Sequence, residues 1–217
     1  MKQLVIFDLD GTLLNTIDDL GMATNYALRK CGYAEHDLSS YPMFVGNGVT
    51  KLLERVLPPD MVTRENVEAL RCHFTEYYDV HCTDSSRPYP GIDDLLLELQ
   101  AKGVWMAVAS NKYDAAVKQL IAHFFPRINW AAVEGHHEGV PVKPDPSIVF
   151  GILSKSPTPK SEVLYVGDSG VDMETARRAC VESVGVTWGF RPYKELREHY
   201  AGHIVSTPSE ILGIVEG

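Results

Sequence analysis

Two carboxylates follow an apolar run near the start of the chain, and their spacing could support metal-dependent nucleophilic chemistry. Residues 4–7 are apolar, and Asp8 and Asp10 come directly after them. Two neighbouring carboxylates repel each other unless a cation or a proton lies between them. The pair therefore favours a divalent metal bound through oxygen, with one carboxylate able to act as a nucleophile. For these residues alone, the alternative is a strand end followed by an ordinary Asp-Gly turn.

Two further polar clusters could hold a phosphate group. The hydroxyl of Ser110 and the amide of Asn111 could donate hydrogen bonds to phosphoryl oxygens, or they could simply begin a helix. Lys143 lies in a segment stiffened by prolines, and it offers a point charge for a phosphate or for a crowded carboxylate. The alternative for Lys143 is a solvated lysine before a helix.

A last cluster supplies two more carboxylates, Asp168 and Asp172, after a glycine that permits a tight turn. Asp172 follows Asp168 by four residues, which is about one helical turn. A further carboxylate could complete a magnesium site with Asp8, because Mg²⁺ takes few protein oxygens and keeps several waters. The alternative is an aspartate that caps a helix, with a second acid in its first turn.

The elements around these clusters predict an α/β fold with a parallel sheet. Short apolar segments predict strands at residues 4–7, 104–109, 130–133, 162–166, 183–186 and 204–205. Helical patterns alternate with them at residues 91–102, 112–123, 146–155, 171–180 and 208–215. Alternating strands and helices favour a parallel sheet covered on both faces. Because the clusters lie just past predicted strands, we expect them to converge on one crevice at the carboxyl ends of the strands.

The region between the first strand and Pro88 has a different pattern. It contains predicted helices at residues 16–30, 49–57 and 63–78, and it shows no convincing strand. We therefore expect two domains: an α/β core of residues 1–14 plus 88–217, and a helical insert of residues 15–87.

The composition excludes several classes of protein. The chain has 20 Lys and Arg against 29 Asp and Glu, so its net charge of −9 disfavours nucleic acid and anionic membranes as partners. No apolar run approaches the roughly 20 residues that span a bilayer. The 4 cysteines show no Cys-x-x-Cys pair, so free thiols and a cytoplasmic location are expected. No self-complementary patch is evident, which leaves a monomer or a weak homodimer.

Taken in order, the clusters resemble the four motifs of the haloacid dehalogenase superfamily. The matching residues are Asp8-Leu9-Asp10-Gly11-Thr12, Ser110-Asn111, Lys143-Pro144, and Gly167-Asp168-Ser169 with Asp172. The resemblance implies a Rossmann-like core with an inserted all-α cap of the C1 type. The Gly-Thr that ends the first motif is similar to the phosphatase branch. Softer matches at residues 45–48, 90–91 and 184–189 resemble the phosphoglycolate phosphatases.

The resemblance also implies roles for these residues. Asp8 would attack phosphorus, and Asp10 would serve as general acid and base. Asp8, Asp10 (through its carbonyl) and Asp168 would hold Mg²⁺, with Asp172 in support. Ser110, Asn111 and Lys143 would bind the phosphate of a small phosphorylated metabolite, first of all 2-phosphoglycolate.

Three alternatives to this activity stay open. A mutase similar to β-phosphoglucomutase would keep both Asp8 and Asp10. A pyrophosphatase or nucleotide phosphatase of the same branch would also keep them. A catalytically silent binding protein would be expected to lose one of them, and the chain has both.

Overall fold

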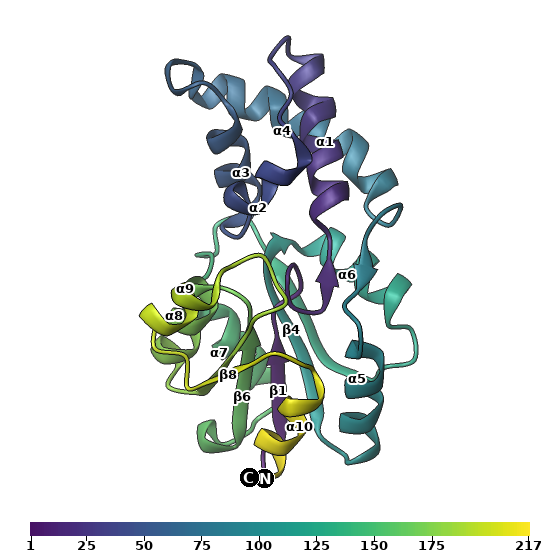
Figure 1. Ribbon diagram of the computed structural model, residues 1–217, viewed down its shortest axis with the longest axis vertical. Helices are drawn as coiled ribbons and strands as arrows, with labels where there is room; N and C mark the ends of the chain where they lie inside the picture. The colour runs from purple at the N-terminus through teal and green to yellow at the C-terminus, as the bar shows by residue number, and fades with distance from the viewer.

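A parallel sheet forms the centre of the protein in a computed structural model that describes all 217 residues (Figure 1). Its six strands run in the order β5-β4-β1-β6-β7-β8. Their bounds are β1 Leu4–Phe7, β4 Trp105–Tyr113, β5 Trp130–His136, β6 Val163–Gly167, β7 Glu182–Val186 and β8 His203–Val205. All neighbouring strands pair in parallel, and Phe7 lies opposite Val108 on one side and Val166 on the other.

Helices cover both faces of the sheet. They are α5 Ile92–Ala101, α6 Asp114–Phe124, α7 Ser147–Lys155, α8 Gly170–Ala179, α9 Tyr193–Glu198 and α10 Ser209–Glu216. Because successive strand residues point to opposite faces, β1 contributes to two apolar cores. Val5 and Phe7 pack in the core that also holds residues of α5, α6 and α10. Leu4 and Ile6 pack in the core shared with α7 and α8.

Four further helices form a separate layer beyond the carboxyl ends of the strands, at the top of Figure 1. They are α1 Ile17–Lys30, α2 Tyr41–Phe44, α3 Gly48–Val56 and α4 Arg64–His81, and we call them the helical module. The rings of Tyr26 on α1 and Tyr77 on α4 lie 4.8 Å apart. The buried side chains of the module continue without interruption into the core under one face of the sheet.

A short antiparallel ribbon joins the module to the sheet layer. β2 Leu14–Asn15 leads into the module and β3 Arg87–Pro88 leads out of it, and the two strands pair with each other. Asp19, at the start of α1, supports this crossing because its buried carboxylate accepts bonds from the backbone of Ser85 and Ser86. The sequence pattern predicted no strand between residues 15 and 87, so Asn15 and Arg87 correct that expectation at its two ends. Strands of two residues are too short to show the alternation of apolar and polar residues by which a strand is recognised in a sequence.

The remaining predicted elements are present, with two differences that matter. The strand expected at 104–109 continues to Tyr113, so α6 begins at Asp114 instead of residue 112. Ser110 and Asn111 therefore lie inside β4, in a stretch where its register with β5 is irregular, and not after its end. The helices α2 and α9 were not predicted. None of the helices has the length and apolar character needed to cross a membrane, and all four cysteines are free thiols.

Candidate active site

The first two aspartates leave β1 at the centre of the sheet and then separate. Asp8 is buried, and its backbone N–H still bonds to β6 through the carbonyl of Val166 at 2.9 Å. Gly11 follows with φ +88°, a left-handed conformation that favours glycine. A Cβ at Gly11 would run into the carboxylate of Asp168. The turn at Gly11 therefore requires glycine both for its backbone angle and for its closeness to a third aspartate.

Three buried carboxylates meet at the end of β1 and β6. Oxygen atoms of Asp8, Asp168 and Asp172 all lie within 4.8 Å of one another. Burial raises the pKa of Asp8 to about 7, helped by the charge of Asp172 and opposed by Lys143. Burial also raises the pKa of Asp168 well above its usual range, and the charges of Asp172 and Asp8 add to the effect. A positive charge next to the cluster would therefore stabilise its ionised carboxylates.

Lys143 supplies one positive charge to the cluster. Its ammonium group lies 2.8 Å from Asp8 Oδ1 and 2.7 Å from Asp172 Oδ1, and it also donates to the Ala109 carbonyl and the Tyr165 hydroxyl. Burial disfavours the charged ammonium, but the two carboxylates outweigh that cost, so the pKa of Lys143 is raised well above its ordinary value. Lys143 is therefore a fixed cation between the first and last clusters.

The loop after β6 shapes the opposite wall of the site. Ser169 and Asp172 form a reciprocal capping box at the start of α8, which fixes the Asp172 carboxylate. Asp168 is held from another direction, because the backbone N–H of Phe190 donates to its Oδ2 at 2.6 Å. Of the alternative considered for this cluster, the acid in the first turn is present as Asp172, but the cap is Ser169 and not an aspartate. The Asp172 side chain also reaches Lys143.

Ser110 and Asn111 lie beside the aspartates despite their position inside β4. The Asn111 side chain exchanges bonds with the backbone of Lys143, accepting from its N–H at 2.7 Å and donating to its carbonyl at 3.1 Å. The Ser110 hydroxyl accepts a bond from the Lys112 N–H. The Asn111 side chain therefore positions Lys143. The backbone N–H of Asn111 and the hydroxyl of Ser110 remain as the groups that could contact a phosphate.

A cavity of about 60 Å³ lies over these residues, between the sheet layer and the helical module. All seven predicted site residues line it. From the module it is lined by Leu20, Val45, Gly46, Gly48, Val49, Leu52, Phe74 and Tyr78. The structure thus brings the four clusters together at one crevice, at the point where the strand order reverses around β1.

Comparison with known proteins identifies this arrangement. Residues 5–186 match the family model of haloacid dehalogenase-like hydrolases. The chain is 29% identical over 214 residues to the phosphoglycolate phosphatase of Aquifex aeolicus, covering 99% of this chain and 97% of that protein. It is 33% identical over 198 residues to the phosphoglycolate phosphatase of Vibrio cholerae, covering 87% and 85%. The chain belongs to the haloacid dehalogenase-like hydrolase family.

Solved structures agree with this assignment to the haloacid dehalogenase-like hydrolases. A crystal structure of a provisionally assigned phosphoglycolate phosphatase from Lactobacillus delbrueckii subsp. bulgaricus has a TM-score of 0.92, at 32% identity and 99% coverage of both chains. The chain is therefore a phosphatase of this family, with the α/β fold and helical module of its relatives.

In this haloacid dehalogenase-like hydrolase the acidic cluster suits a hard divalent cation. Its donors are carboxylate oxygens, which Mg²⁺ prefers, and the three side chains come close enough to share one ion. Lys143 forms ion pairs with Asp8 and Asp172 but not with Asp168, so the third carboxylate has no cation of its own. The residues present therefore fit Mg²⁺, and Asp8, Asp168 and Asp172 are the side chains that could hold it.

Two functional neighbours of the hydrolase site escaped the sequence interpretation. Lys112 pairs with Asp10 at 3.0 Å, and Thr16 donates to the same Asp10 oxygen at 2.6 Å. Lys112 directly follows Asn111, but the sequence predicted it to be the first residue of a helix and so gave no reason to assign it to the site. Thr16 was only the first residue of a predicted helix; it is the N-cap of α1, but its side chain bonds to Asp10 and makes no capping bond. The signal available for Lys112 was its adjacency to the second cluster.

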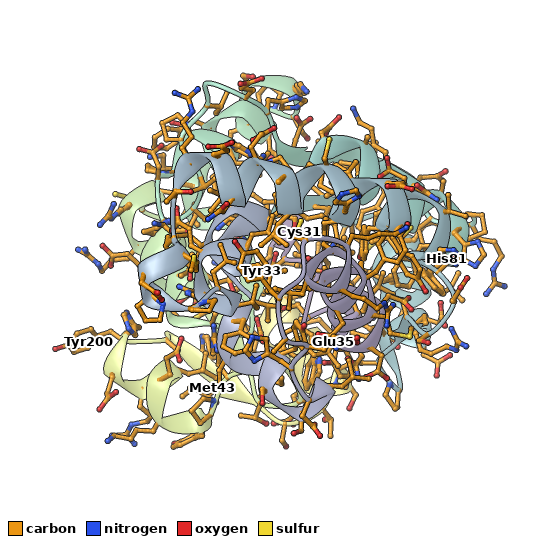
Figure 2. All side chains as sticks on the ribbon, turned by 90° about the horizontal axis from the view of Figure 1, so that it is seen from above. Cys31, Tyr33, Glu35, Met43, His81 and Tyr200 are labelled. Carbon is orange, nitrogen blue, oxygen red and sulfur yellow. The ribbon has the colours of Figure 1, made fainter.

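Arg191 connects the hydrolase core with the module. It lines the cavity from the loop before α9. Its guanidinium also donates at 2.6 Å to the carbonyls of Pro42 and Val45, next to the cavity. In the view from above in Figure 2, the exposed Met43 of α2 lies over the C-terminal part of the sheet layer. This position agrees with the two bonds from Arg191 to the neighbouring residues Pro42 and Val45.

Proposed function

We propose that the protein is a magnesium-dependent phosphatase that hydrolyses a small phosphomonoester, most readily 2-phosphoglycolate, through an aspartyl-phosphate on Asp8. The observation that carries the proposal is the meeting of Asp8, Asp10 and Asp168 with Lys143 under one small cavity. The names of the Aquifex and Vibrio relatives support 2-phosphoglycolate as the first substrate to test. Free thiols at every cysteine suit a reducing compartment, so we place the enzyme in the cytoplasm.

Asp8 acts as the nucleophile in this proposal. An oxygen of Asp8 forms a bond to phosphorus while the bond from phosphorus to the ester oxygen breaks, and water later cleaves the aspartyl-phosphate to give inorganic phosphate. Lys143 holds Asp8 at 2.8 Å and keeps its carboxylate oriented. When bound by Asp8, Asp168 and the Asp10 carbonyl, Mg²⁺ supplies positive charge that offsets repulsion between the carboxylate and the phosphate.

Asp10 moves the protons. It gives a proton to the leaving ester oxygen, and then takes one from the attacking water, which is general acid and base catalysis worth about 10²–10⁴-fold. Thr16 and Lys112 fix the orientation of its carboxylate. The Ser110 hydroxyl and the Asn111 backbone N–H bind phosphoryl oxygens, and Asp172 supports Lys143.

The helical module acts as a cap. We assign residues 15–87 to this cap and residues 1–14 plus 88–217 to the catalytic core. The cavity lies between the two, so the cap would exclude water from the first step and limit the size of the leaving group. The two-stranded ribbon of β2 and β3 is the joint at which it would move.

The test is phosphate release from 2-phosphoglycolate, pyrophosphate, nucleotides, sugar phosphates and p-nitrophenyl phosphate, with Mg²⁺ and with EDTA. Turnover that needs Mg²⁺ and is highest with 2-phosphoglycolate supports the proposal. Highest turnover with pyrophosphate or a nucleotide would replace the substrate and leave the chemistry intact. Absence of release from all of them, with isomerisation of a sugar phosphate upon addition of a bisphosphate, would establish a mutase instead.

A further inference from the structure

The cavity is lined by three cationic side chains, and they differ in how the protein uses them. Lys143 contacts four protein oxygens, from two carboxylates, one carbonyl and one hydroxyl. Arg191 spends its two terminal nitrogens on cap carbonyls. Lys112 pairs only with Asp10, at 3.0 Å. Arg191 keeps a second N–H on each of these nitrogens, but Lys112 is the cation that lies against Asp10 and still has donors left over for a ligand.

Lys112 also lies next to Asp10, the carboxylate that would protonate the leaving group. Its side chain is only 5% exposed, and its ammonium lies 4.9 Å from the ring centre of Tyr78 on α4. Asp10 has to reach the ester oxygen within about 2.6–3.2 Å to protonate it. A group two bonds beyond that oxygen then comes within reach of an ammonium held 3.0 Å from the same carboxylate.

The rest of the cavity roof would reject a charge. It presents Leu20, Val45, Val49, Leu52 and Phe74, and burying a carboxylate against such side chains is costly without a partner. Tyr78 is the exception, because its buried hydroxyl has no hydrogen-bond partner. An anionic leaving group would therefore depend on Lys112, with Tyr78 as a neutral donor beside it.

We propose that Lys112 is a specificity-determining residue that binds a carboxylate carried by the leaving group. This inference rests on the proposed phosphatase activity and narrows its substrate class. The preferred substrates are small phosphomonoesters whose carboxylate is attached to the carbon that bears the ester oxygen. The same ammonium orients Asp10 before substrate binds, so one lysine joins proton transfer to recognition of charge.

The experiment compares two esters that differ in one charge. They are 2-phosphoglycolate and its amide, phosphoglycolamide, which has nearly the same size and no negative charge on the leaving group. Lys112→Met removes the ammonium and keeps most of the chain length, and Lys112→Arg keeps a cation. Lys118→Met is the matched control, because Lys118 is exposed on α6 and pairs with Asp114 away from the cavity.

We expect Lys112→Met to lower kcat/KM for 2-phosphoglycolate about 10- to 100-fold more than for the amide, mainly through a higher KM, because a charge-assisted contact is lost. Lys112→Arg should recover part of that ratio, and Lys118→Met should not change it. If Lys112 only orients Asp10, both esters lose activity equally and the ratio stays constant, which would overturn the inference.

Two further measurements keep the result interpretable. Glycolate should raise the Tm of the wild type and of Lys118→Met but not that of Lys112→Met, which reports carboxylate binding without turnover. If Lys112→Met does not fold, Lys112→Gln is judged by the same ratio. Wild-type protein that releases phosphate from no ester, p-nitrophenyl phosphate included, would refute the proposed function itself. Release from p-nitrophenyl phosphate but not from 2-phosphoglycolate, or hydrolysis of both test esters with an unchanged ratio in the variant, refutes only the role of Lys112.

Discussion

The two sides of the cavity are built from different materials. The core side places buried charges at the ends of neighbouring strands, with Lys143 set between Asp8 and Asp172. The cap side presents mostly apolar side chains and backbone from short helices. Strands held on both sides by the sheet can fix atoms closely, while an apolar roof can change size without disturbing charges. The comparison teaches that selection by size, at the apolar cap side, is separable from the reaction, whereas the proposed recognition of charge by Lys112 stays with the core side.

A change on the core side should have the largest effect. Asp8→Asn keeps the shape of the side chain but removes the nucleophile, so we expect phosphate release to fall by at least about 10⁴-fold. Release of phosphate from 2-phosphoglycolate or p-nitrophenyl phosphate measures it. Asp18→Asn, on the exposed side of α1, is the matched control and should retain activity. An Asp8→Asn protein with a few per cent of wild-type turnover would show that another group forms the covalent bond.

Removing the buried cation should be the next largest effect. Lys143→Met leaves two carboxylates buried without their partner, which is expected to cost about 3–5 kcal/mol of stability. Denaturant unfolding in EDTA measures this cost, with the exposed Lys118→Met as the control.

The same variant should respond to pH in a defined direction. The folded protein holds a proton on Asp8 more tightly than the unfolded chain does, because its pKa is raised to about 7. Stability from such a group is fully present below the unfolded pKa and is lost as pH rises through the folded one. Without Lys143 the pKa of Asp8 rises further, so the deficit of the variant should stay level between pH 5 and pH 6 and grow as pH rises through about 7. A deficit that shrinks over that range would contradict the charge account.

A change on the cap side should alter selection more than rate. Val49 on α3 lines the cavity and is half-buried, so Val49→Ala widens the roof at little cost to folding. We expect the ratio of kcat/KM for a sugar phosphate to that for 2-phosphoglycolate to rise about tenfold, the effect of one or two methyl groups in an apolar pocket. Val80→Ala, an exposed position on α4, serves as the control. Equal losses for both esters would indicate that the roof affects catalysis itself.

The smallest effect should come from the contact between the two sides. Arg191→Gln removes two bonds from the core to the carbonyls of Pro42 and Val45. Water replaces these bonds in the open arrangement, so we take the pair together as worth about 0.5–1.5 kcal/mol, and KM should rise about two- to tenfold as the closed arrangement becomes less favourable. Steady-state kinetics beside Arg197→Gln, an exposed residue of α9, would measure it. An unchanged KM would mean that Arg191 does not hold the cap closed.

The core side was largely predictable from the sequence, and the reason is local. Asp8 and Asp10 directly follow an apolar run, and Gly167 and Asp168 end another, so each cluster reveals its own strand end. The extension of β4 through Asn111 was not predictable, because its pairing with β5 decides it.

The cap side and the contacts between the sides were less predictable. The role of Lys112 depends on its ion pair with Asp10, about a hundred positions away in the chain. The role of Arg191 depends on its hydrogen bond to the carbonyl of Pro42 in α2. A backbone carbonyl has no sequence signature, so no pattern could have indicated the second contact. Contacts of this kind follow only from the fold.

The place of β1 in the sheet has a consequence for how the protein is made. Its partners are Trp105–Tyr113 and Val163–Gly167, so the first strand to leave the ribosome finds its second neighbour only after about 160 residues have followed. At about 5–20 residues per second, residues 4–7 wait roughly 5–20 s with both edges open, and roughly 10–30 s until the second edge can be covered. Helices α1 and α4 can meet much earlier. The strand that leads to Asp8 is thus synthesised before both of its partners and is completed late.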